Sequence, residues 1–156
     1  MGFQANKQSC LGAAFYILSD HPLSSTIHTT YTKLTMTNIK TVEFKPFSDQ
    51  KPGTSGLRKK VVRFQEAHYS ESFVTSILLS IPEGVKDSEL VIAGDGRFWN
   101  PEVIQTIAKI STAYGVKKLL IGQNGILSTP AASHVIRKRK ATGGILLTAS
   151  HNAGGK

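Results

Sequence analysis

Residues 89–147 read ELVIAGDGRFWNPEVIQTIAKISTAYGVKKLLIGQNGILSTPAASHVIRKRKATGGILL. Three short runs rich in apolar residues stand out: Glu89 to Ala93, Leu119 to Ile121, and Ile145 to Leu147. Each run has the length of a buried strand, and the segments between them are long enough for helices of about 10–15 residues. Strands that alternate with such helices are typical of right-handed βαβ crossovers. The stretch therefore predicts an α/β fold with a mixed, mainly parallel sheet.

The helices between these strands carry their own start and stop signals. Asn100-Pro101-Glu102 supplies a cap, a proline at the first helical position and an acid in the first turn, and Gly115 is placed to end that helix. Thr129-Pro130 opens the next helix, which we expect to run to Lys140 and to close at Gly143-Gly144. The order strand, helix, strand, helix, strand follows.

The segment before residue 89 divides less clearly. Apolar residues that alternate over residues 42–47 predict a strand, and residues 60–65 predict a second one, in a hairpin-like arrangement around a turn-rich loop. A helix is expected from Ser70-Glu71, because apolar residues then recur at helical spacing until Pro82.

The beginning of the chain differs from the rest. A short apolar run from Cys10 to Leu18 is followed by a stretch rich in Ser and Thr, with little periodicity. We expect a poorly ordered N-terminal extension at residues 1–37 and one domain at residues 38–156. The basic residues ahead of the apolar run are too few for a secretory signal peptide. The single cysteine excludes a disulfide within the chain and any multi-cysteine zinc site, and we expect a cytoplasmic protein.

The chain is basic, with 19 Lys and Arg against 10 Asp and Glu and a net charge of +9. A field of that sign attracts phosphate groups, on sugars or on nucleic acid. Basic runs occur at residues 58–60 and 137–140, which a solvated strand edge and a helix C-terminus also explain. We expect no nucleic-acid partner, because no aromatic platform and no base-reading motif accompanies the charge. A membrane partner is not expected either, because no apolar stretch reaches the roughly 18 residues of a spanning helix.

Glycine-rich polar loops follow two of the predicted strands, at the sheet edge where α/β proteins place ligands. They are Gly94 to Arg97 and Thr148 to Gly155. Neither loop is a nucleotide fingerprint, because the third glycine of G-x-G-x-x-G and the pattern G-x-x-x-x-G-K-[ST] are both missing. A phosphate-binding loop and a plain strand-to-helix turn both fit the second loop. His151 is not expected to be the base for Ser150, because neighbours in an extended segment point to opposite sides.

A third loop, Lys51 to Arg58, combines a turn with two hydroxyl groups and a cation. As a phosphate clasp, it would use Arg58 as a bidentate donor and the hydroxyl groups of Thr54 and Ser55 as further donors. A simple turn explains the same residues.

Four motifs are shared with one known family. They are KPGTSGLR at residues 51–58, GDGR at 94–97, GQNGILSTPA at 122–131 and TASHN at 148–152. In this order and at these separations they resemble the first domain of the phosphoglucomutase family, in the α-D-phosphohexomutase superfamily. The resemblance covers about residues 40–155.

The resemblance implies a monomeric enzyme that interconverts glucose 1-phosphate and glucose 6-phosphate. Ser150 would carry the phosphoryl group, glucose 1,6-bisphosphate would be the intermediate and activator, and Mg2+ would bind the phosphate on Ser150. Arg58 would lie near the phosphoserine, and His151 would flank it within the catalytic site. The residues that would bind substrate or phosphate are Thr54, Ser55 and Asn152.

The chain also departs from the family pattern. Ala153 stands where the family has a proline, and Lys156 comes too early to be the family's functional lysine. The metal-binding aspartates, the sugar-specificity loop and the distal phosphate site of the family have no counterpart in the sequence. We therefore expect a truncated first domain that is inactive alone. The alternatives are a noncatalytic basic module that binds phosphate or nucleic acid, and a truncated gene product.

Overall fold

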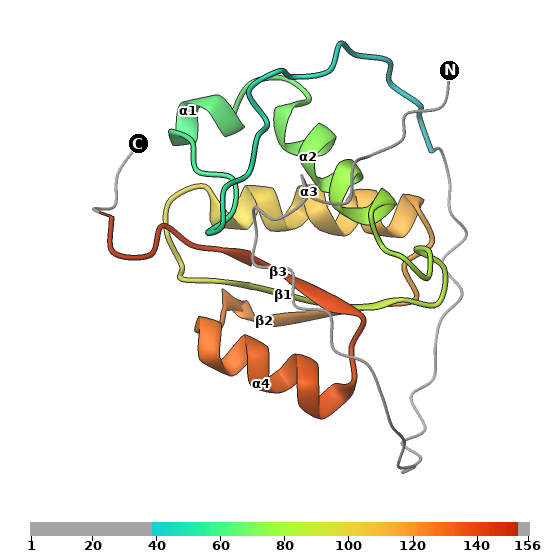
Figure 1. The fold of residues 1–156 in the computed structure, drawn as a ribbon, viewed down its shortest axis with the longest axis vertical. Coiled ribbons are helices and arrows are strands. Elements are labelled where there is room, and N and C mark those ends of the chain that lie inside the picture. Colours follow the sequence, from blue (N-terminus) through green and yellow to red (C-terminus); the bar gives the residue numbers. More distant parts are fainter. Residues whose placement is uncertain (1–38, 153–156) are drawn as a thin grey trace.

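The computed structural model describes residues 39–152 of the chain. Helices α2 and α3 cover one face of a three-stranded sheet and α4 covers the other, so the fold has three layers (Figure 1). The predicted extension at residues 1–37 lies outside the described residues, as do residues 153–156. In chain order the elements are α1 (Val61–Phe64), α2 (Tyr69–Leu79), β1 (Glu89–Gly94), α3 (Asn100–Ala113), β2 (Lys118–Ile126), α4 (Thr129–Arg139) and β3 (Gly143–Leu147).

The sheet has the strand order β2-β1-β3, and both strand pairs are parallel. Val91 in the central strand lies opposite Leu120 on one side and Gly144 on the other. Parallel neighbours need a crossover connection, which α3 provides between β1 and β2 and α4 provides between β2 and β3. The predicted α/β fold with βαβ crossovers is confirmed.

Strand β1 is buried on both faces, because consecutive side chains point to opposite sides of the sheet. Leu90 and Ile92 belong to the core shared with α2 and α3. Val91 and Ala93 belong to a second core, which is shared with α4 and includes Ile136. The carboxyl end of β1 therefore emerges at the centre of the sheet edge, between the ends of its two neighbours.

The ends of the helices follow the sequence signals in part. Gly115 adopts φ +82° after Tyr114, the C-cap of α3, as predicted for a residue that ends a helix. Helix α4 ends at Arg139, and the next residue, Lys140, takes the left-handed conformation at φ 55°. The prediction that Gly143-Gly144 closes this helix is wrong, since both glycines begin β3. A Cβ at Gly144 would lie 2.8 Å from Val91 O and from Ile136 Cδ1, so close packing of strand against helix requires a glycine there.

The two strands predicted before residue 89 are absent from the described residues. Residues 42–47 form no strand, and the ring of Phe44 lies 6.1 Å from the rings of Phe47 and His68. Part of the second predicted strand, residues 60–65, is helix α1. Val61 and Phe64 are three residues apart, so one helical turn lets both line the same cavity beside α2. Packing against α2 thus replaces the predicted hairpin.

Within residues 39–152, no helix combines the length and the apolar character needed to cross a membrane.

Candidate functional site

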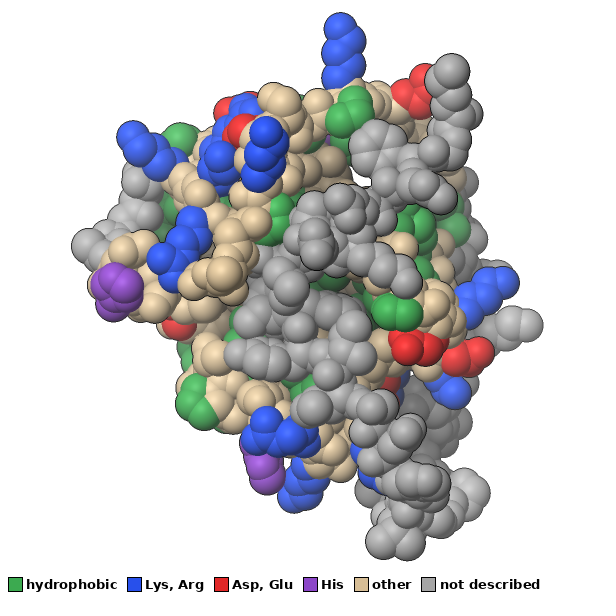
Figure 2. Space-filling view, viewed as in Figure 1, with side chains coloured by type: hydrophobic (Ala, Val, Ile, Leu, Met, Phe, Trp, Pro, Cys, Tyr) green, Lys and Arg blue, Asp and Glu red, His purple; other side chains and the backbone are tan. Residues whose placement is uncertain are grey.

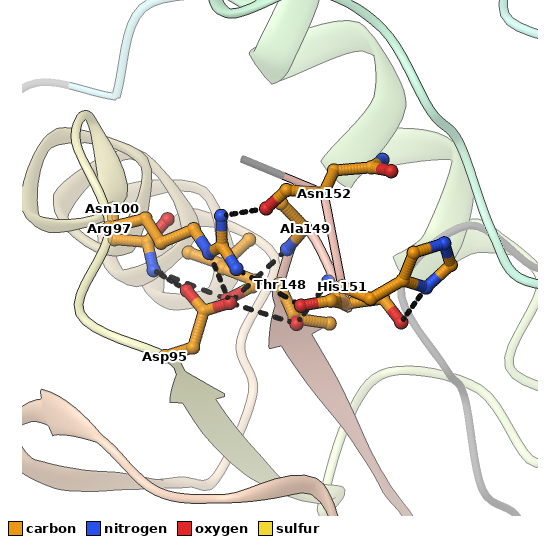
Figure 3. A network of polar contacts seen from close by, with 9 residues as sticks. Asp95, Arg97, Asn100, Thr148, Ala149, His151 and Asn152 are labelled. Atoms are coloured by element: carbon orange, nitrogen blue, oxygen red, sulfur yellow. Dashed lines mark hydrogen bonds and ion pairs between the residues drawn. The ribbon is translucent and has the colours of Figure 1, made fainter. Parts of the chain in front are cut away.

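Two loops meet at the carboxyl ends of β1 and β3, and the carboxylate of Asp95 joins them (Figure 3). The backbone N–H of Asp95 donates to Leu147 O at 3.1 Å, which links the end of β1 to the end of β3. Asp95 Oδ2 accepts hydrogen bonds from Thr148 Oγ1 at 2.9 Å and from Ala149 N at 3.2 Å. The carboxylate of the first loop therefore holds the start of the second.

The ionisation of Asp95 follows from these contacts. Burial favours the neutral acid and raises the pKa of Asp95, whereas the hydrogen bonds from Thr148, Ala149 and Arg97 favour the carboxylate. The hydrogen bonds prevail, and the pKa of Asp95 lies below its usual value. Near neutral pH the loop is held by a charged acceptor, which makes its hydrogen bonds stronger than those to a neutral group.

Arg97 forms a second connection between the loops. Its Nε donates to Asp95 Oδ2 at 2.8 Å, its Nη2 donates to Ser150 O at 3.0 Å, and its Nη1 donates to Asn152 O. Figure 3 shows the guanidinium between Asp95 and the backbone of the serine loop. One side chain thus fixes both the carboxylate and the path of the chain around Ser150.

Asn100 takes a different position from the predicted one. Trp99 occupies the cap position of α3 at φ 70°, and no side chain caps the helix from that position. Its Nδ2 donates instead to Leu147 O at 3.2 Å and Asp95 Oδ1 at 3.4 Å. The prediction of an Asn100 cap is wrong, because Asn100 is already the first residue of α3 and its side chain donates to the strand end and the carboxylate.

The crowding at this junction explains Gly94. A Cβ at Gly94 would lie 2.7 Å from Asn100 Nδ2 and 3.1 Å from Leu147 O. Any side chain at residue 94 would push apart the groups that orient Asp95, so the junction needs a glycine.

Ser150 is exposed and lies at a bend of its loop. Its φ of 55° is left-handed, and its N–H donates to Thr148 Oγ1 at 2.9 Å. Ser150 Oγ lies 3.3 Å from His151 Nδ1. The expectation that the two side chains point to opposite sides is wrong, since it assumed an extended backbone. The His151 ring extends away from the Asp95 network (Figure 3).

Arg58 approaches the serine loop from a different part of the chain. It lines a cavity of about 310 Å3 together with Thr148, Ala149 and Asn152. Among residues 39–152, Arg58 has no hydrogen-bond or ion-pair partner. Basic side chains gather over α1 and the segment before it, with a further group over α4 (Figure 2). The structure therefore brings Arg58 and Asn152 to one cavity beside the loop of Ser150 and His151.

The structure does not bring Thr54 and Ser55 to this cavity. They form the exposed tip of a turn that is closed by two hydrogen bonds, Gly53 N to Gly56 O at 3.1 Å and Gly56 N to Gly53 O at 3.0 Å. Neither hydroxyl lines the cavity. Their predicted role in phosphate binding stays a prediction.

The ends of the 51–58 loop are held by a cluster around Asp49. Arg63 donates two hydrogen bonds to this carboxylate, at 2.9 and 3.1 Å, and its guanidinium lies 4.6 Å from the centre of the Tyr69 ring. Gln50 Nε2 also donates to Tyr69 O at 2.7 Å. The hydrogen bonds from Arg63 hold the pKa of Asp49 far below its usual value, against the opposing effect of burial. These contacts fix the loop that presents Arg58.

The sequence predicts Ser150 and Arg58 as site residues and Asn100 as a helix cap only. It gives Asp95 and Arg97 no role beyond their place in the 94–97 motif. The available signal was their position after β1, because the carboxyl ends of adjacent parallel strands meet at one edge of the sheet. Asp95 is therefore close in space to the serine loop, although the two are far apart in sequence.

A magnesium site is incomplete within the described part of the chain. No group of three or more His, Cys, Asp or Glu side chains there could hold a metal ion. The carboxylate closest to the serine loop, Asp95, is already engaged by Thr148, Ala149 and Arg97. These residues alone do not fit the oxygen-rich, near-octahedral coordination that Mg2+ requires.

Comparison with known proteins places these features in a family. Residues 49–156 match the family described as Phosphoglucomutase/phosphomannomutase, alpha/beta/alpha domain I. The chain is 78% identical over 118 residues to a phosphoglucomutase of Aspergillus oryzae, covering 76% of this chain and 21% of that protein. It is 57% identical over 122 residues to Phosphoglucomutase-1 of Homo sapiens, covering 77% and 22%.

A solved structure agrees with these sequence matches. The open form of pp63/parafusin, a phosphoglucomutase from Paramecium, superposes with a TM-score of 0.66 at 42% identity, covering 72% of this chain and 21% of that one. The chain spans about a fifth of the length of the curated relatives it matches. On the sequence motifs, the sheet and these matches, the chain belongs to the phosphoglucomutase/phosphomannomutase family and carries its α/β/α domain I.

Proposed function

We propose that Ser150 carries the phosphoryl group in a phosphoglucomutase-type interconversion of glucose 1-phosphate and glucose 6-phosphate. The observation that supports this most directly is the hydrogen-bonded connection of Asp95 and Arg97 to the loop around an exposed Ser150. A residue that gives and takes a phosphoryl group must be accessible and held in one geometry. Ser150 has both properties without belonging to a buried structural network.

The transfer balances as two displacements at phosphorus. In the first, the C6 hydroxyl oxygen of glucose 1-phosphate attacks the phosphorus on Ser150, a new P–O bond forms, and the bond from phosphorus to Oγ breaks. Oγ leaves with the electron pair and takes up a proton, while the sugar hydroxyl gives one up. Glucose 1,6-bisphosphate then turns round, and Ser150 Oγ attacks the phosphorus at C1 to release glucose 6-phosphate.

The other residues have supporting roles in this proposal. Arg58, which has no partner within residues 39–152, would neutralise charge on the phosphoryl oxygens. His151 would position the hydroxyl through its contact with Oγ at 3.3 Å. We assign phosphate or substrate binding to the exposed polar groups of Thr54, Ser55 and Asn152.

Mg2+ and glucose 1,6-bisphosphate are proposed as the cofactor and the activator of the reaction. The described residues supply no complete metal site, so we derive no step that passes through the metal. A monomeric state and a cytoplasmic location are further proposals, which size-exclusion chromatography and fractionation of cells would test.

A chimera provides the direct test of Ser150. Residues 39–156 replace the matching stretch of the Aspergillus oryzae phosphoglucomutase, and phosphopeptides are mapped by mass spectrometry after incubation with glucose 1,6-bisphosphate. We expect one phosphorylated residue, Ser150, with no label and no turnover in Ser150→Ala. The control, Ser48→Ala, removes another exposed hydroxyl and should change neither readout. Label on His151, or turnover by Ser150→Ala, would contradict the proposal, and phosphate binding without transfer would favour a noncatalytic module.

The 156-residue chain alone is expected to show no measurable turnover. Metal and substrate-orienting groups supply most of the catalysis of phosphoryl transfer, and the described residues contain no metal site. A coupled assay of glucose 6-phosphate formation on the purified chain measures this. Turnover that persists through further purification and is lost in Ser150→Ala would show that the expectation is wrong.

A further inference from the structure

The cavity beside the serine loop extends well beyond the polar groups of the proposed site. It has a volume of about 310 Å3 and reaches between α1, α2, α3 and the end of β3. Its deep wall is apolar, formed by Phe73, Val74, Ile77, Val103 and Ile107. A volume of this size lies at the lower end of the range for small-molecule sites. A sugar would lose hydrogen bonds to water against such a wall, so the deep part does not suit a hexose.

The charges at the cavity have one sign. Arg58, Lys59 and Arg97 line it, and none of its lining residues is Asp or Glu. Lys59 is paired with Asp49 at 3.5 Å, and Arg97 is paired with Asp95 at 2.8 Å. Arg58 is the cation of the three that has no anionic partner among residues 39–152. The cavity thus combines an apolar wall with an unneutralised guanidinium, which complements a ligand with an apolar body and an anionic head.

Two aromatic residues favour a flat body for that ligand. Phe98 and Trp99 line the cavity with their ring centres 6.2 Å apart, and Phe98 remains 47% exposed. Trp99 adopts φ 70°, a conformation that a bulky residue rarely takes. Strained residues of this kind cluster at ligand sites. Offset or edge-on contact with these rings would stabilise an aromatic ligand.

We propose that this cavity binds an aryl phosphate, whose ring lies along Phe98, Trp99 and the apolar wall and whose phosphate meets Arg58. This ligand is chemically distinct from the hexose phosphate of the proposed function. Because both would use Arg58, an aryl phosphate would compete with the sugar phosphate at the mouth of the cavity.

Trp99 is the only tryptophan of the chain, so its fluorescence reports on the cavity directly. Phenyl phosphate is titrated into the 156-residue chain, with binding followed by Trp99 emission and by calorimetry. Inorganic phosphate tests the anionic group alone, and benzyl alcohol tests the aromatic ring without the charge. Glucose 6-phosphate tests a phosphate that carries a sugar in place of the ring. We expect phenyl phosphate to bind at least roughly tenfold more tightly than each of the three, since apolar burial and a charge-assisted hydrogen bond both contribute.

Three variants locate the site. Arg58→Gln should weaken phenyl phosphate binding roughly tenfold or more, because the charge-assisted hydrogen bond is lost. Val103→Phe fills the cavity from α3 and should abolish the change in Trp99 emission. Lys138→Gln removes the same charge from the exposed end of α4, on the other face of the sheet, and should leave binding unchanged.

The proposal is overturned if phenyl phosphate binds no more tightly than inorganic phosphate. It is also overturned if Lys138→Gln weakens binding as much as Arg58→Gln, which would indicate a general charge effect. Arg58 is exposed, so its variant tests the site even where Val103→Phe does not fold. Trp99 emission and calorimetry measure binding without any phosphoryl transfer, so a failure of this proposal is distinguished from a failure of the proposed function.

Discussion

Asp95 and Asp49 are two carboxylates that each engage an arginine, yet they organise the chain in different ways. Asp49 accepts hydrogen bonds from the side chains of Arg63 and Tyr69, and the Arg63 guanidinium stacks on the Tyr69 ring. Asp95 accepts hydrogen bonds from the hydroxyl and the backbone of the serine loop. The first carboxylate joins side chains that fix where a loop begins and ends. The second shapes the backbone of the loop that carries the proposed nucleophile.

This difference predicts that loss of Asp95 affects activity most. In the chimera, Asp95→Ala should lower kcat roughly hundredfold, because the serine loop would lose its acceptor and a displacement of about 1 Å costs that much. The melting temperature should fall by less than in a core variant, since the Asp95 side chain remains partly exposed and contributes only its hydrogen bonds. Steady-state kinetics and thermal unfolding of the same preparation measure the two effects. A variant that keeps parental kcat would show that the serine loop holds its geometry without Asp95.

Substitution of Gly144 is predicted to lower the stability of the fold more than any other change considered. A Cβ there would lie 2.8 Å from Val91 O and Ile136 Cδ1, so Gly144→Ala should lower the free energy of unfolding by about 2 kcal/mol. The matched control is Gly53→Ala in the 51–58 loop, where no heavy atom lies within 4 Å of the added Cβ. Urea unfolding of the 156-residue chain measures both variants. Equal stability of the two variants would mean that the sheet adjusts to the added methyl group.

Asp49→Asn should have the opposite effects to Asp95→Ala, with a larger loss of stability and a smaller loss of kcat. The neutral amide weakens the paired hydrogen bonds from Arg63, and we expect a lower melting temperature together with a weakened approach of Arg58 to the proposed site. In the chimera this predicts a raised KM with kcat nearly unchanged. Arg63→Lys, which keeps the charge and loses the bidentate geometry, should show the same effect in part. An equal loss of kcat in Asp49→Asn and Asp95→Ala would remove the distinction between the two carboxylates.

The smallest effect concerns pH. Both carboxyl groups have a lower pKa in the folded chain than an unfolded aspartate, whose pKa is about 4. Their contribution to stability is therefore fully present above about pH 4 and is lost as the pH falls from there through the folded pKa values. Asp95→Asn and Asp49→Asn should each flatten the decrease of the melting temperature in acid. Parallel curves for parent and variant would contradict the lowered pKa values.

The sheet and its two crossover helices could be predicted from the sequence because their signals are local and agree with one another. Strand-length apolar runs lie on either side of a helix that has a proline near its start and a glycine after its end, and the structure has those elements. Residues 61–64 could not be predicted in the same way. The β-branched Val61 and Val62 favour a strand, whereas the helical turn depends on contacts with residues distant in sequence, such as those of Arg63 with Asp49.

The residues of the candidate site also fall into those that the sequence could predict and those that it could not. Ser150 and Arg58 could be named from their motifs, whereas the contact between Ser150 and His151 depends on a left-handed backbone that serine does not signal. The role of Asp95 depends on which strand ends are neighbours, and strand order is a property of the whole sheet.

The left-handed conformation of Ser150 bears on the stability of the folded chain. Such a backbone is sterically unfavourable by roughly 1 kcal/mol or more for a residue with a side chain, and glycine would adopt it without that strain. The chain therefore places its proposed phosphoryl carrier at a position where a residue without a hydroxyl would relieve the backbone. If Ser150 carries the phosphoryl group as proposed, the hydroxyl is kept at this position at some cost in backbone stability.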